Sequence, residues 1–320
     1  MPLRIICSIA VMLLIMAGAE PSHAARKLVA AVLSSDLSRY REAHKAFTRT
    51  LTQKGFDQSN IEIIIQTPNP DPISWANTIR KFNAIGADII ITYGAPVTLS
   101  AMREADNIPI VFVDVYGPVE TGIIRSMSVP GGKLTGVSSK VPMITLIKTA
   151  QELKPIRTLG VLYNSREIGS AVQLKEIKRI GAQLGFAVVE SNVSSMTALD
   201  NALSSLLWSH VDCIYVSESA SASRSFEKIV YWANENKLPV ISHMPDAAEK
   251  GALVALEVNS AEQGEIAGDY AAKILSGKKP AQMSIGTPKK INLIVNLKAA
   301  KVLGLHVPLQ VLNLATKLVK

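Results

Sequence analysis

Two stretches of the chain share one pattern, and this pattern decides the fold. Residues 28–56 read LVAAVLSSDLSRYREAHKAFTRTLTQKGF, and residues 159–186 read LGVLYNSREIGSAVQLKEIKRIGAQLGF. Each stretch begins with a short apolar run, continues through a polar turn into a segment with apolar residues three and four apart, and closes on Gly-Phe. This order is typical of a strand, a loop and an amphipathic helix, with Gly55 and Gly185 as helix caps. Its repetition predicts two similar lobes.

Shorter apolar runs extend this pattern along the chain. Four such runs belong to each predicted lobe, and a helical or turn-rich stretch follows each of them. Alternating strands and helices predict an α/β fold in which each Rossmann-like lobe has a parallel sheet. The predicted strands are residues 28–33, 61–66, 88–92 and 108–114, then 158–163, 186–190, 212–217 and 238–242.

The segments near the C-terminus indicate how the lobes are joined. They comprise an apolar run at 253–256, a helix over about 261–275 and a strand at 291–296, which are too few for a third domain. We expect them to return to the two lobes, giving three chain crossings and a hinge. The resulting division assigns residues 25–139 plus 252–284 to the first lobe and residues 140–251 plus 285–320 to the second.

The N-terminus predicts export. Arg4 precedes an apolar run over residues 5–19, and small residues follow before Ala25, as in a cleaved signal peptide of residues 1–24. A retained membrane helix is the alternative, but the apolar run is short for a bilayer-spanning anchor. Lipidation needs a cysteine directly after the run, whereas Cys7 lies inside it. We therefore expect a periplasmic protein without a lipid.

The composition excludes several classes of protein. A hydrophobic fraction of 48% with 19% charged residues is typical of a globular chain rather than a disordered one. The net charge of +8 comes from lysines and arginines spread over many helical segments, which indicates surface solvation and no nucleic-acid partner. After removal of residues 1–24, Cys213 is the remaining cysteine, so no intrachain disulfide can form. Its apolar surroundings predict a small buried side chain.

Candidate site residues follow from where the predicted strands end. In a parallel sheet, ligands bind beyond the carboxyl ends of the strands, where loops and helix N-termini meet, and two facing lobes enclose a cleft there. The side chains at these ends are small, polar or aromatic. They are Ser35, Asp36, Tyr40, Gly94, Ala95, Thr98, Asp114 and Tyr116 from the first lobe, and Asn164, Glu218, Ser219 and Asp246 from the second.

Two of these positions indicate the kind of ligand. The turn from Gly94 to Thr98 enters a helix and offers backbone N–H groups and a hydroxyl, which suit a carboxylate. Ordinary helix capping is the alternative. Glu218, on the opposite lobe, suits an ammonium group or hydroxyls, with a solvated surface carboxylate as the alternative. Tyr116 can cover an apolar part of the ligand or pack in the core.

Motifs of catalysis and metal binding are missing from the sequence. It contains no GxSxG, HExxH, CxxC, P-loop or GxGxxG pattern, and its histidines lack the spacing of metal ligands. We therefore predict no catalytic residue, metal or cofactor. An enzyme that uses Asp36, Glu218 or His243 for acid–base chemistry stays open as an alternative.

Five longer stretches, spread over nearly the whole mature chain, carry a family resemblance. They are PGGKLTGVSS (130–139), LKPIRTLGVLYNSREIGSAVQLKEIK (153–178), CIYVSES (213–219), KGALVALEVNSAEQGEIAGDYAAKILSGKKP (250–280) and INLIVNLKAAKVLGL (291–305). In order and spacing they resemble ABC-type solute-binding proteins of the type I periplasmic-binding fold, in the subgroup of tryptophan- and tyrosine-binding proteins.

The resemblance implies a role for individual residues. The implied ligand contacts are Gly94, Ala95 and Thr98 at the acidic end of the ligand, Asn164, Ser170 and Glu218 from the second lobe, and Asp114 and Ser139 as further candidates. The chain departs from similar proteins where they often read Asp-Tyr-Tyr, since it has Asn259, Ser260 and Ala261, and it has Gly169 where they often have asparagine. These departures favour a ligand smaller or less aromatic than tryptophan.

The resemblance also implies a function and partners. It predicts the monomeric periplasmic component of an ABC importer, which captures an amino acid or related carboxylate and delivers it to a membrane permease and its ATPase. A binding protein that docks on a receptor for sensing is the alternative, because both roles need a cleft that closes and a docking face.

Overall fold

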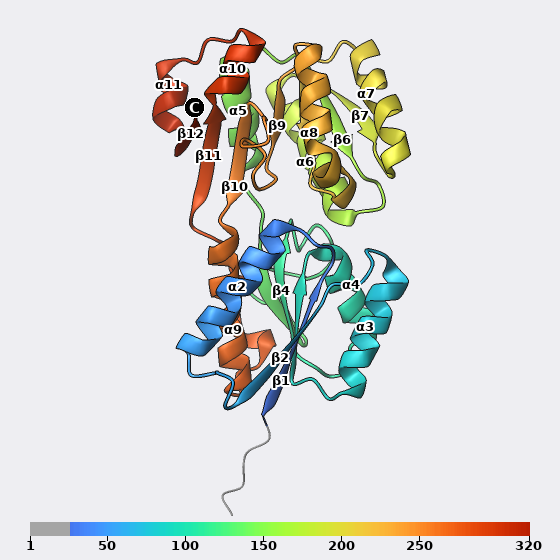
Figure 1. The fold of residues 1–320 in the computed structure, drawn as a ribbon, viewed down its shortest axis with the longest axis vertical. Helices are drawn as coiled ribbons and strands as arrows, with labels where there is room; N and C mark the ends of the chain where they lie inside the picture. Colours follow the sequence, from blue (N-terminus) through green and yellow to red (C-terminus); the bar gives the residue numbers. More distant parts are fainter. Residues whose placement is uncertain (1–25) are drawn as a thin grey trace, which may run out of the picture.

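The computed structural model describes residues 26–320, so the predicted signal peptide over residues 1–24 lies outside the described residues. The described residues form two α/β lobes stacked end to end (Figure 1). Each lobe has one sheet with helices on both faces, which confirms the predicted fold class. Within residues 26–320, no helix combines the length and the apolar character that crossing a membrane requires.

The first lobe is built on a five-stranded parallel sheet with the strand order β2-β1-β3-β4-β5. Because helices bury both faces, its inner strands are continuous apolar runs. The strands are β1 (Lys27–Leu33), β2 (Ile61–Gln66), β3 (Ile89–Tyr93), β4 (Ile110–Val115) and β5 (Leu134–Ser138). Helices α2 (Ser38–Gln53) and α9 (Ser260–Leu275) cover one face, and α3 (Pro72–Ala84) and α4 (Ala95–Glu104) cover the other; the short helix η2 (Pro280–Gln282) follows α9.

Helix α2 is held in place by the returning helix α9. The predicted apolar stripe of α2, with Tyr40, Ala43 and Phe47, is buried. Helix α9 approaches this stripe closely because Gly264 has no side chain: a Cβ there would lie 1.9 Å from the carbonyl oxygen of Ala43. This packing fixes the first turn of α2, which carries Arg39 towards the other lobe.

The second lobe is built on a seven-stranded sheet with the order β12-β11-β10-β9-β8-β6-β7, parallel except for the pair β10–β11. Its strands are β6 (Thr158–Tyr163), β7 (Ala187–Asn192), β8 (Cys213–Val216), β9 (Val240–Ser242), β10 (Val254–Val258), β11 (Ile291–Asn296) and β12 (Lys317–Val319). Helices α5 (Met143–Leu153), α6 (Ile168–Leu184), α10 (Leu297–Leu303) and α11 (Leu309–Leu314) cover one face, and η1 (Met196–Ala198) leads into α7 (Leu199–Trp208), which covers the other face with α8 (Ala220–Glu235).

The second repeat folds as the first does. Leu174, Ile177 and Ile180 of α6 face the core, and Gly185 ends the helix with a φ of +78°, which glycine adopts without strain. Cys213 in β8 is 1% exposed, as predicted for a small buried side chain. Burial raises the pKa of its thiol to about 12.

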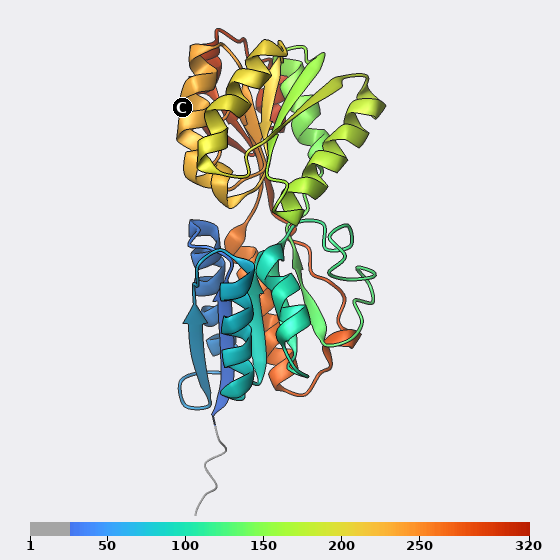
Figure 2. The ribbon, with the colours of Figure 1, turned by 90° about the vertical axis from the view of Figure 1, so that its right-hand side faces the viewer.

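The chain crosses between the lobes three times, at the narrow waist seen in Figure 2. The crossings lie between β5 and α5, between β10 and α9, and between Gly286 and β11. The prediction that residues 252–284 belong to the first lobe is wrong at Val254–Val258, because β10 pairs with β9 and β11 in the second sheet. Residues 285–286, predicted for the second lobe, stay with the first, where Gly286 pairs with Val137.

Candidate ligand-binding cleft

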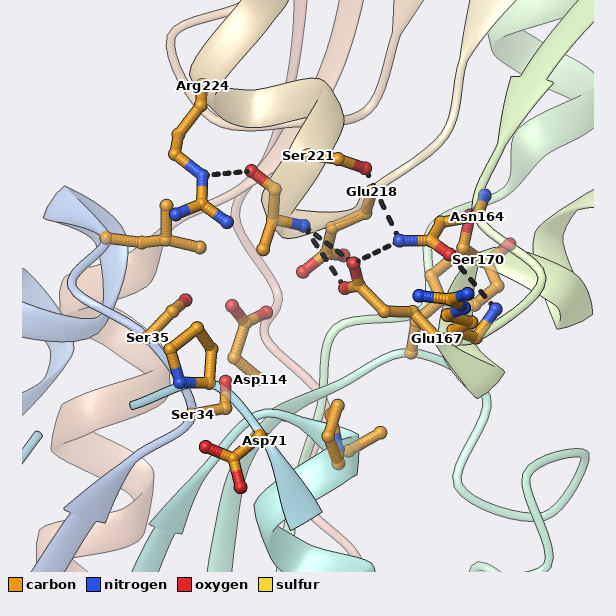
Figure 3. Close-up of a pocket in the computed structure, with 18 of the residues that line it drawn as sticks. Ser34, Ser35, Asp71, Asp114, Asn164, Glu167, Ser170, Glu218, Ser221 and Arg224 are labelled. Atoms are coloured by element: carbon orange, nitrogen blue, oxygen red, sulfur yellow. Dashed lines mark hydrogen bonds between the residues drawn. The ribbon is translucent and has the colours of Figure 1, made fainter. Parts of the chain in front are cut away.

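A cavity of about 680 Å³ lies between the lobes and is lined by residues of both. Many of its lining residues come directly after strands β1, β3, β4, β6 and β8, where ligands bind in parallel sheets. Others come from the first turns of α3, α6 and α8. Figure 3 shows the polar side chains of the two lobes facing each other across this space.

The wall from the first lobe supplies most of the apolar residues of the lining, beside polar residues that include Asp71 and Asp114. Trp75 contributes an indole ring to this wall. It is 9% exposed, packs among the core residues of this lobe, and donates a hydrogen bond from Nε1 to the carbonyl oxygen of Ser34 at 3.3 Å. The α3 start is fixed by Asp71, which accepts from the backbone of Ser74 at 2.9 Å. The apolar residues of this wall are Leu37, Pro70, Pro72, Trp75, Ala95 and Pro96.

The wall from the second lobe is polar and internally bonded. The Ser170 hydroxyl accepts from the backbone N–H of Asn164 at 2.8 Å and lies 2.5 Å from the hydroxyl of Ser217. The Asn164 side chain donates to Glu167 at 2.8 Å and to Ser221 at 3.3 Å (Figure 3). These bonds join the loops after β6 and β8 into one rigid surface.

Glu167 occupies the N-terminus of α8. Both of its carboxylate oxygens accept from the backbone N–H of Ala220, at 3.0 and 3.1 Å. Free N–H groups and the helix dipole favour an anion at this position. Burial, together with the charge of Glu218, nevertheless raises the pKa of Glu167. A side chain of the protein therefore already fills the anion site of this helix.

Arg39 connects the two walls. Its guanidinium pairs with Asp114 of the first lobe at 2.7 Å and with Glu218 of the second, and it also donates to the Tyr40 hydroxyl at 3.2 Å. All of these side chains are buried or nearly so, with Arg39 7% exposed and Glu218 13% exposed. Asp114 has a φ of +57°, a strained conformation for a residue with a side chain. The interlobe contact is thus made by buried charges.

The two carboxylates beside Arg39 differ in pKa. Burial would raise the pKa of Glu218, but Arg39 and the ring of His243, whose Nε2 lies 3.2 Å from the carboxylate, together lower it. The pKa of Asp114 is raised by burial and by the charge of Glu218, against the effect of Arg39. Glu218 therefore holds its negative charge more strongly than Asp114 does.

Most of the predicted site residues line the cavity. The structure brings together Ser35, Tyr40, Ala95, Asp114 and Tyr116 from the first lobe with Asn164, Ser170 and Glu218 from the second. Gly169, one of the departures from similar proteins, also lines it, and a side chain there would meet open space.

The other predicted residues lie outside the lining. The Thr98 hydroxyl is fully buried and donates to the Gly94 carbonyl at 2.8 Å, so it stabilises the first turn of α4. Gly94 itself allows Tyr40 to approach, since a Cβ would lie 2.5 Å from the tyrosine hydroxyl oxygen. Ser139 is buried next to the first crossing, after β5.

The remaining three are held elsewhere by ordinary contacts. Asp36 is exposed and pairs with Arg41. Ser219 caps α8 and accepts from the backbone of Ala222 at 3.1 Å. Asp246 lies in the turn after β9 with a φ of +61°.

Sequence reasoning did not select several residues that line the cavity. Arg39, Glu167, Gln173 and Arg224 line the cavity but are not among the site residues predicted from the strand ends. A usable signal existed for Gln173, because it is a polar residue beside the apolar stripe Leu174–Ile177–Ile180 of α6. Residues 26–320 contain no group of three or more histidine, cysteine or acidic side chains placed to hold a metal ion.

Comparison with known proteins finds relatives that match most of the chain. Residues 29–319 match the family model described as ABC transporter substrate binding protein. A curated relative from Clostridioides difficile named tyrosine-binding protein is 28% identical over 267 residues, which cover 83% of this chain and 77% of the relative.

Solved structures show the same fold. The chain aligns with a Streptococcus pneumonia protein in complex with L-Trp at a TM-score of 0.86 and 22% identity, covering 92% of this chain and 100% of that one. It aligns with the ligand-free, open structure of a Clostridium difficile substrate-binding protein at a TM-score of 0.72 and 28% identity, covering 92% and 99%. The higher score belongs to the ligand-bound neighbour although the open one shares more residues.

Proposed function

The chain belongs to the family of ABC transporter substrate-binding proteins, and we propose that its interlobe cavity captures an amino acid or a related amphiphilic carboxylate for import. The observation that carries this proposal is an interlobe cavity whose apolar residues come mostly from the first lobe, whose second-lobe wall is polar, and whose two walls are joined by buried charges. Its volume of about 680 Å³ falls in the range of small-molecule sites.

The charges of the cavity favour a ligand with an ammonium group. When ionised, Asp71, Asp114, Glu167 and Glu218 contribute four negative charges to the lining and Arg39, Arg166 and Arg224 contribute three positive ones, so the lining carries −1. Carboxylates in such surroundings bind a cation well, because it removes their mutual repulsion. The tyrosine-binding relative and the L-Trp complex of a structural neighbour support an amino acid as the ligand.

Closure around the solute follows from the fold. We propose that residues 26–139 plus 260–286 and residues 140–259 plus 287–320 move as two bodies about the three crossings. The Arg39–Glu218 contact joins the lobes, and the higher TM-score with the L-Trp complex is consistent with a closed arrangement.

We further propose that the protein is exported to the periplasm, is a monomer, and delivers its solute to a permease with its ATPase. Docking on a receptor for sensing is the second role that the same cleft could serve.

The geometry favours binding without catalysis over the enzyme alternative. Asp36 is exposed and paired with Arg41, and His243 lies behind Glu218 outside the cavity lining. The three acid–base candidates therefore do not meet around one reacting group.

A melting screen tests this function. Amino acids, keto acids, sugars and amines are added to the purified protein, and a ligand at a hundredfold excess over its Kd should stabilise the fold by about 2.7 kcal/mol. The melting temperature would rise by roughly 4 °C for a protein of this size. Recovery of the hit unchanged by mass spectrometry separates binding from turnover. Stabilisation by sugars or amines alone, without any carboxylate, would contradict the proposal.

A further inference from the structure

Gln173 lines the cavity, and its side chain holds a buried hydrogen-bond donor for which residues 26–320 supply no partner. It lies on α6, lines the cavity and is 1% exposed. Its Nε2 has no hydrogen-bond partner among the described residues. Buried amide groups are nearly always bonded, so such a donor at a ligand cavity indicates where a ligand atom binds.

The orientation of this amide is fixed by its neighbours. Its Oε1 lies 2.8 Å from the backbone N of Glu218, and a backbone N–H can only donate. The Tyr215 hydroxyl donates to the same oxygen at 3.2 Å. The atom that faces Glu218 is therefore the oxygen, and the NH₂ group is the half of the amide left without a partner.

We propose that Gln173 is the specificity-determining residue for the acid group of the ligand, donating from Nε2 to a carboxylate oxygen while Glu218 and Asp114 hold the adjacent ammonium group. The inference rests on the proposed function. It moves the acid-binding end from the start of α4, where the sequence predicted it, to α6 in the second lobe. The side chain of the amino acid then points to the wall around Trp75.

Two observations support this placement over the α4 start. The Gln173 side chain accepts from the backbone N–H of Glu218 at 2.8 Å, which holds the amide next to the residue whose carboxylate is the proposed partner of the ammonium group. At α4 the Thr98 hydroxyl already has partners, and Pro96 has no N–H to offer. The anion site at the start of α8 is filled by Glu167.

The test compares Gln173→Glu with Gln183→Glu, the same change at an exposed position of the same helix. Glutamate at 173 keeps an oxygen for the N–H of Glu218 but replaces the donor by a second acceptor. The probes are L-tyrosine and L-tryptophan, each paired with the amine that lacks its carboxylate, tyramine and tryptamine. Isothermal titration measures the Kd values, and melting of the ligand-free variants checks the fold.

We expect Gln173→Glu to weaken amino-acid binding by about 100-fold or more and to leave amine binding equal or stronger, because a site built to bond a polar group rejects a mismatched one. Gln183→Glu should bind both probes as the unaltered protein does. If Gln173→Glu and the unaltered protein bind the amino acids with equal Kd values, the proposed role of Gln173 is wrong, whereas the proposed function stands. Failure of the unaltered protein to bind any amino acid or keto acid of the melting screen would instead overturn the proposed function.

Discussion

The two walls of the cavity are built from different chemistry. The first lobe presents Trp75 and the prolines around α3 and α4 beside serines and the carboxylates of Asp71 and Asp114, whereas the second lobe presents almost entirely polar groups, with amides, hydroxyls and carboxylates bonded to one another. The lobes share a fold, so the difference lies in the loops after equivalent strands. It suggests that the two lobes bind different parts of a ligand: the second lobe binds the polar head group, and the first lobe contacts the apolar side chain.

Removing Arg39 should break this division most strongly, because this residue joins both walls. Arg39→Met leaves Asp114 and Glu218 buried without their cation, and breaking a buried pair in this way costs about 3–5 kcal/mol. Urea unfolding at pH 8 measures the loss. The control, Arg41→Met, removes an exposed pair with Asp36 and should cost less than about 1 kcal/mol. Equal losses would show that the interlobe contact does not support the fold.

The two lobes should also respond to pH in opposite directions. In the first, burial lowers the pKa of His44 from 6.5 to about 4, so the folded state binds fewer protons than the unfolded chain and stability falls as pH drops from 6.5 to 4. In the second, burial and the charges of Glu249 and Asp246 raise the pKa of Glu257 from 4.5 to about 7. Stability therefore falls as pH rises from 4.5 to 7.

Two variants separate these effects, each of the order of 3 kcal/mol. Glu257→Gln should be more stable than the unaltered protein at pH 8 and equally stable at pH 4.5. His44→Gln should retain stability better below pH 6 and keep a partner for the Tyr93 hydroxyl, which lies 3.0 Å from the His44 ring. Urea unfolding at several pH values gives the curves, and curves parallel to that of the unaltered protein would refute the assignment.

A smaller effect should come from the apolar wall. Trp75→Phe removes part of a ring that faces the cavity and its bond to Ser34, and should weaken binding of large amino acids by about 1 kcal/mol, or roughly fivefold. The preference for an amino acid over its amine should not change. Phe82→Leu, fully buried on the same helix away from the cavity, serves as the control and should lower stability alone. A changed preference in Trp75→Phe would mean that the walls are not independent.

The parts of the site that follow from strand ends could be predicted from the sequence. Asp114, Asn164 and Glu218 come at or just after strands of a parallel sheet, and such ends meet at one edge whatever the details of packing. The amphipathic stripes of α2 and α6 were equally readable, because their spacing matches the helical period.

The parts that depend on side-chain reach could not be predicted. Gln173 projects from the second turn of α6, and its importance comes from the N–H of Glu218, which is distant in the sequence. Thr98 has the right residue type at the right place, but its hydroxyl turns back to Gly94. The sequence also did not predict which sheet contains β10, because an apolar run does not determine the strands with which it pairs.

The buried thiol of Cys213 has a practical consequence. With 1% exposure and a pKa of about 12, it holds too little thiolate to react with maleimides at neutral pH. A cysteine introduced at the cavity rim in the chain without residues 1–24, for instance Ser195→Cys, would be the site modified by a fluorescent dye. Lobe movement would then alter the dye's surroundings, turning the protein into an optical probe for its own solute.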